Sequence, residues 1–115
     1  MKKVLLLLIL IESALAVSAA TYRVKYDIQN ERSTNFTITV SYDRLVIGNN
    51  TYSLRRMGSI TSSGLTFDSY AYGAGENRMF CISTSSINIK KDWLTTLSGY
   101  MIIIDNKAYL ADKIN

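Results

Sequence analysis

Composition narrows the chemistry of this chain before any pattern is considered. Its 115 residues include no histidine, no proline and one cysteine, and 48% of them are hydrophobic, with a formal net charge of +4. Because it has no histidine, the chain can form no catalytic Ser-His pair and no zinc site built from imidazoles. It also lacks a histidine general base for catalysis near neutral pH. We therefore expect a protein that is not an enzyme and that binds no cofactor and no metal.

The first 19 residues have the layout of a secretory signal peptide. A pair of lysines precedes an apolar run over residues 4–11, and small residues follow up to Ala19. The run is too short to span a hydrocarbon core of about 30 Å. We expect cleavage after Ala16 or Ala19 and export to the periplasm or the medium. A single domain over residues 20–115, with no integral membrane segment, would remain.

The charged residues of that domain do not predict a nucleic-acid surface. Cleavage lowers the net charge from +4 to +3, and the basic residues are scattered, with Arg55-Arg56 and Lys90-Lys91 as the doublets. Neither doublet is interleaved with aromatic residues, as nucleic-acid surfaces usually are. Cys81 lies in an apolar run and is expected to be a buried hydrophobic residue.

Alternation of apolar and polar residues predicts strands along most of the domain. The inward positions of the first two strands are Tyr22, Val24, Tyr26 and Ile28, followed by Phe36, Ile38, Val40 and Tyr42. Turn residues near 48–50, 73–77 and 106–107 predict connections between further strands. About eight short strands at spacings of roughly 8–12 residues indicate an all-β fold, either a small antiparallel β-barrel or a sandwich.

One segment departs from the strand pattern. Asp92 is a plausible helix N-cap, Trp93 and Leu97 have helical spacing, and Gly99 is a plausible helix stop. We expect one short helical turn near residues 92–98 that packs Trp93 against an end of the sheet.

The segment over residues 52–80 resembles the family of periplasmic and membrane-bound inhibitors of C-type lysozyme. Tyr52-Ser53-Leu54 matches the family's Tyr-x-Leu strand end. Residues 61–67, TSSGLTF, match its Ser-x-Ser-Gly-x-x-Tyr loop, with Thr61 for the first serine and Phe67 for the tyrosine. Residues 72–75, YGAG, match its aromatic-x-Lys-Gly segment, with Ala74 in place of the lysine.

The resemblance implies an eight-stranded antiparallel barrel that inserts this loop into a lysozyme cleft. It assigns partner binding to Ser62, Ser63, Gly64, Phe67, Tyr72 and Gly75, with the Ser63 hydroxyl meeting the catalytic carboxylates. Gly64 would let the loop turn tightly. A plain turn between two strands is the alternative for this loop. For the whole protein, the alternative is an envelope or surface interaction module that uses its basic tyrosine-bearing surface or the apolar residues 100–105.

Overall fold

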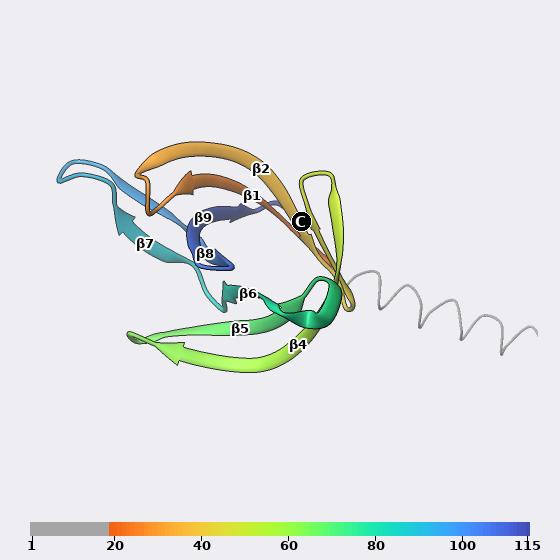
Figure 1. Ribbon diagram of the computed structural model, residues 1–115. Helices are drawn as coiled ribbons and strands as arrows, with labels where there is room; N and C mark the ends of the chain where they lie inside the picture. Colours follow the sequence, from red (N-terminus) through yellow and green to blue (C-terminus); the bar gives the residue numbers. More distant parts are fainter. Residues whose placement is uncertain (1–18) are drawn as a thin grey trace, which may run out of the picture.

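The computed structural model describes residues 19–115, which form nine strands and one short 3-10 helix (Figure 1). The strands are β1 (Ala20–Asp27), β2 (Arg32–Val40), β3 (Arg44–Ile47), β4 (Asn50–Ser62), β5 (Leu65–Tyr72), β6 (Arg78–Ser83), β7 (Ile87–Lys90), β8 (Thr96–Ile104) and β9 (Lys107–Lys113), and the helix is η1 (Ala74–Glu76). No helix in this range has the length and apolar character needed to cross a membrane. The predicted signal peptide lies outside the described residues except for Ala19.

The strands form one antiparallel sheet that closes on itself. Their order is β6-β5-β4-β3-β2-β1-β9-β8-β7, and β6 also pairs with β8 through Phe80–Ile104, Cys81–Ile103 and Ile82–Ile102. This last pairing closes a ring of eight strands, while β7 pairs with the first residues of β8. The predicted all-β fold is confirmed, and its form is the barrel rather than the sandwich.

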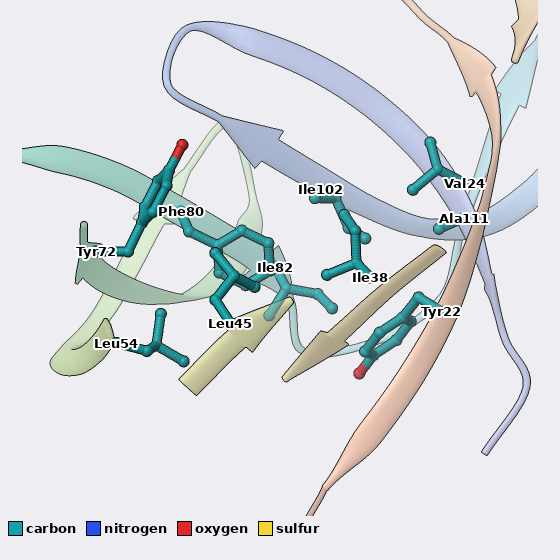
Figure 2. Packing of buried hydrophobic residues seen from close by; sticks show 10 residues of the cluster. All are labelled: Tyr22, Val24, Ile38, Leu45, Leu54, Tyr72, Phe80, Ile82, Ile102 and Ala111. Atoms are coloured by element: carbon teal, nitrogen blue, oxygen red, sulfur yellow. The ribbon is translucent and has the colours of Figure 1, made fainter. Parts of the chain in front are cut away.

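Apolar side chains from all eight strands of the ring fill its inside. The buried cluster consists of Tyr22, Val24, Ile38, Leu45, Leu54, Tyr72, Phe80, Ile82, Ile102 and Ala111. Figure 2 shows Phe80, Leu45 and Ile82 lying close together in the middle of this cluster. Edge-to-face aromatic pairs add to the packing, among them Tyr22 with Tyr100 at 5.7 Å between ring centroids. The structure thus confirms the predicted inward positions Tyr22, Val24 and Ile38.

Two details of the predicted strands need correction. Tyr42 was expected to face inward but is 77% exposed, because β2 ends at Val40 and Tyr42 lies in the turn that follows. In β1 a bulge interrupts the alternation: Val24 pairs with Ala111, whereas Tyr26 pairs with the adjacent residue Leu110. Since neighbouring residues of β9 face opposite sides of the sheet, the bulge turns Tyr26 to the outer side, where the residue is nevertheless buried.

The short helical turn exists, but at another place. It is η1 at Ala74–Glu76, whereas residues 91–94 form bends and residues 96–98 begin β8. The Asp92 side chain accepts hydrogen bonds from the backbone N–H groups of Leu94 and Thr95, as an N-cap would. The chain then pairs with β7 instead of continuing as a helix, so the expected packing of Trp93 against the sheet is wrong.

Gly99 has a packing role inside β8 instead of ending a helix. A Cβ atom at this position would lie 2.5 Å from the carbonyl oxygen of Ala111, closer than such atoms approach in proteins. The absence of a side chain therefore lets β8 approach β9 where the barrel and the β7–β8 hairpin meet. Cys81, on the outer side of β6, is buried as expected.

Candidate binding site at the free end of the β4–β5 hairpin

The loop that resembles the lysozyme-inhibitor motif forms the end of the longest hairpin. Strand β4 ends at Ser62 and β5 begins at Leu65, so the turn consists of Ser63 and Gly64. Their φ angles are 52° and 80°, and positive values at both central residues are the mark of a type I′ turn. In Figure 1 this end of the hairpin extends to the left of the ring.

Backbone and side-chain contacts hold the turn. Ser62 pairs with Leu65 and Thr61 with Thr66, and the two threonine hydroxyls lie 3.3 Å apart. The carbonyl oxygen of Thr66 also accepts hydrogen bonds from the backbone N–H and the hydroxyl of Thr84. The turn therefore presents exposed hydroxyl groups from a paired, laterally supported hairpin rather than from a long loop.

An apolar groove of about 360 Å³ lies beside the turn on the outer face of β4, β5, β6 and β8. Three of the predicted partner-binding residues, Ser62, Ser63 and Phe67, line it. The groove residues that sequence reasoning missed are Ile60, Leu65, Met79, Cys81, Met101 and Ile103. Ile60 and Met79 are 44% and 43% exposed, so part of this apolar surface is open to a partner.

The other two predicted residues lie at the opposite end of β5. The eight residues of β5 separate the Ser63-Gly64 turn from Gly73, which is a length of about 25 Å at roughly 3.3 Å per residue. Tyr72 is fully buried and Gly75 lies in the exposed helix η1. The structure thus brings Ser62, Ser63, Gly64 and Phe67 together and keeps Tyr72 and Gly75 apart from them.

Tyr72 belongs to a polar cluster that joins two strands to the β8–β9 turn. Its hydroxyl donates to Asp105 Oδ1 at 3.1 Å, and Arg78 binds both oxygens of the same carboxylate at 3.3 and 2.9 Å. The Arg78 guanidinium also lies 4.7 Å from the centre of the Tyr72 ring and 5.3 Å from that of Tyr52. These contacts connect β5, β6 and the β8–β9 turn.

The cluster shifts the pKa of its members in opposite directions. Burial, together with the hydrogen bond to Asp105, raises the pKa of Tyr72 to about 12. The hydrogen bonds from the Arg78 guanidinium lower the pKa of Asp105. Both shifts keep Tyr72 protonated and Asp105 charged near neutral pH, which is the arrangement that holds the strands together.

The turn that contains Ala74 is closed by its own contacts. Gly73 N donates to the Ser53 carbonyl at 3.0 Å, and the Ser53 hydroxyl donates to the Gly73 carbonyl at 3.2 Å. Arg55 Nε bonds Glu76 Oε2 at 2.7 Å. The Arg55 guanidinium, which reaches this turn through Glu76, is therefore already paired with an acid.

Two features that the alternative function would use also make contacts within the barrel. Arg56 pairs with Asp68 at 2.9 Å, which balances the second charge of the Arg55-Arg56 doublet. The apolar residues 100–104 belong to β8, which pairs with β9 along most of this length and with β6 through three residues. This apolar segment is therefore not a free strand edge.

The end of the β4–β5 hairpin combines two kinds of recognition chemistry. The turn supplies small hydroxyl donors, and the groove beside it supplies apolar area. Within residues 19–115, no group of three His, Cys, Asp or Glu side chains is placed to hold a metal ion.

Comparison of the chain with protein-family models, with curated proteins and with solved structures gave no match.

Proposed function

We propose that this chain is an exported binding protein whose β4–β5 hairpin enters the cleft of a partner protein, with a C-type lysozyme as the candidate partner. The single observation that carries the proposal is the Ser63-Gly64 turn, which is exposed and narrow and lies at the free end of a supported hairpin. Residues 59–67 contain no charged side chain, so the end of the hairpin can approach carboxylates without ion-pair competition.

The chemistry of the turn suits a cleft lined by acids. The Ser63 hydroxyl is a small donor, and a hydrogen bond to a charged carboxylate is stronger than one between neutral groups. Gly64 adds no side chain that would block close approach. The groove residues Ile60 and Met79 would then cover apolar surface at the rim of the partner's cleft.

The position of Tyr72 limits which residues make the contact. Tyr72 and Gly75 lie about 25 Å from the turn along β5, so we assign them to holding the barrel and η1 together. Partner contact is assigned to Ser62, Ser63 and Gly64, with Phe67 supporting the groove from below.

Inhibition of cell-wall lysis tests the proposal. The processed protein should slow the lysis of a bacterial suspension by a C-type lysozyme at near-stoichiometric amounts. Ser63→Asp should abolish this effect by placing a negative charge against the carboxylates, and aspartate tolerates the positive φ of the turn. Ser33→Asp, an exposed position in β2, is the matched control with the same change of charge and should leave inhibition unchanged.

Two results would contradict the proposal. The first is full lysozyme activity in the presence of a hundredfold excess of folded protein. The second is equal loss of inhibition in Ser63→Asp and Ser33→Asp, because that result would mean that total charge and not the hairpin turn decides binding.

A further inference from the structure

The loop between β7 and β8 displays two large apolar side chains at its apex. Trp93 is 85% exposed and Leu94 is 76% exposed. Contiguous apolar surface that stays exposed on a folded protein is a common feature of interaction sites. In Figure 1 this loop lies at the outer end of the β7–β8 hairpin, away from the ring of strands.

The loop is held in shape, so the exposure of this pair is a feature of the fold. Asp92 Oδ1 accepts hydrogen bonds from Leu94 N at 2.9 Å and Thr95 N at 2.8 Å. Lys91 N donates to the Thr95 carbonyl at 2.9 Å. These hydrogen bonds close the backbone of residues 91–95 into a turn, and the side chains of Trp93 and Leu94 point away from it as exposed groups.

Basic side chains lie directly behind this apex. Lys90 is exposed at the end of β7. Lys91 is also exposed, and its Nζ lies 6.0 Å from the centre of the Tyr26 ring on the outer side of the barrel. An apolar apex followed by ammonium groups matches the layers of an anionic bilayer, where apolar side chains reach the acyl boundary and lysines meet the lipid phosphates.

We propose that the Trp93-Leu94 apex inserts into the interfacial region of an anionic lipid bilayer, with Lys90 and Lys91 at the level of the headgroups. This inference uses a different loop from the proposed cleft contact and stands independently of it. A specific protein interface needs roughly 1,000 Å² of buried area. A turn of five residues with two apolar side chains falls short of that area, whereas a bilayer accepts a narrow apex without a matching pocket.

Trp93 is the sole tryptophan of the chain and therefore reports on its own environment. The processed protein, purified after export and with its N-terminus established by mass spectrometry, is mixed with vesicles of phosphatidylglycerol and phosphatidylcholine or of phosphatidylcholine alone. We expect a blue shift of the emission and quenching by brominated lipid with the anionic vesicles, and weaker changes with the neutral ones.

Variants that retain Trp93 distinguish the apolar contribution to lipid binding from the electrostatic one. Leu94→Ser should lower the partition coefficient on anionic vesicles by roughly tenfold, because it removes one buried apolar side chain. Lys90→Gln should lower it about fivefold on anionic vesicles and leave neutral vesicles unaffected. Tyr42→Ser, which removes another exposed aromatic side chain from a different turn, is the control and should bind as the unaltered protein does.

Three results would overturn the inference. The first is an emission spectrum that anionic vesicles leave unchanged. The second is equal partitioning of Leu94→Ser and the unaltered protein, which would place the lipid contact elsewhere. The third is a blue shift that grows with protein concentration without vesicles and disappears in Leu94→Ser, because that result would identify a second copy of the chain as the partner.

Discussion

Replacement of Tyr72 by phenylalanine separates the ring of this residue from its hydroxyl. Phenylalanine keeps the buried ring, its edge-to-face contact with Tyr52 at 5.3 Å and its position under the Arg78 guanidinium. It removes only the hydrogen bond to Asp105, and that carboxylate retains both contacts with Arg78. We expect a loss of about 1 kcal/mol in the free energy of unfolding at pH 7. Tyr72→Ala, which also empties the core position, should lose about 3–5 kcal/mol.

The same variant has a distinct dependence on alkaline pH. The folded state raises the pKa of Tyr72 from 10.0 to about 12. Because the unfolded state releases this proton at a lower pH than the folded state, Tyr72 contributes fully to the free energy of unfolding below pH 10. That contribution falls by roughly 3 kcal/mol as the pH rises toward 12. Tyr72→Phe has no proton to lose at this position. The unaltered protein should therefore be the more stable at pH 9 and the less stable at pH 12, with the two curves crossing at about pH 11.

Urea unfolding followed by circular dichroism between pH 8 and 12 measures this crossing. The other tyrosines titrate in both proteins, so their contributions cancel in the difference. Parallel stability curves from pH 8 to 12 would refute the account of a buried hydroxyl that must stay protonated. A loss of 3 kcal/mol or more in Tyr72→Phe at pH 7 would refute the view that Arg78 still satisfies Asp105.

Three further predictions concern other parts of the barrel. Gly99→Ala should lower the free energy of unfolding by about 1–3 kcal/mol in urea titrations, because its Cβ would meet the Ala111 backbone at 2.5 Å; an unchanged midpoint would mean that β8 and β9 can separate freely. Asp105→Asn should make the free energy of unfolding less dependent on pH in acid. A carboxylate whose pKa is lowered by folding stabilises the protein above about pH 4, and this stabilisation is lost as the pH falls through the lowered pKa. An acid dependence as steep as that of the unaltered protein would exclude this contribution. Cys81 should react with a disulfide reagent at least tenfold more slowly in the native protein than in urea, because the thiol is buried; equal rates would show that the outer face of β6 opens readily.

The alternation of apolar residues is sufficient to predict most of the core but not its exceptions. Tyr22 and Val24 face inward as their period predicts. Tyr26 continues the same period in sequence, yet the bulge after Val24 moves it to the outer side. A bulge depends on how two strands meet across the barrel, and no local pattern in residues 21–28 indicates it.

The segment around Trp93 shows how tertiary pairing overrides a local preference. Asp92 carries out the capping chemistry that its residue type predicts, because it accepts hydrogen bonds from the backbone N–H groups two and three residues later. A helix does not follow, since residues 96–99 pair with β7 and gain strand hydrogen bonds instead. Helical spacing over only six residues could not distinguish these outcomes.

The candidate site was predictable in part. The Ser63-Gly64 turn could be located because serine and glycine between two β-forming runs indicate a hairpin. The separation of Tyr72 and Gly75 from the turn also had a signal, since eight residues of strand pattern lie between them. The groove beside the turn had none, because Met101 and Ile103 come from β8, which reaches this face only through its pairing with β6 at the closure of the barrel.

The most direct test of the central claim is whether the hairpin and a substrate compete for the same cleft. Binding of the processed protein to a C-type lysozyme is measured by calorimetry, without and with a saturating soluble oligosaccharide that fills the lysozyme cleft. The account predicts measurable binding that the oligosaccharide abolishes and that Ser63→Asp lacks. Undetectable binding, or binding that the oligosaccharide leaves unchanged, would contradict it.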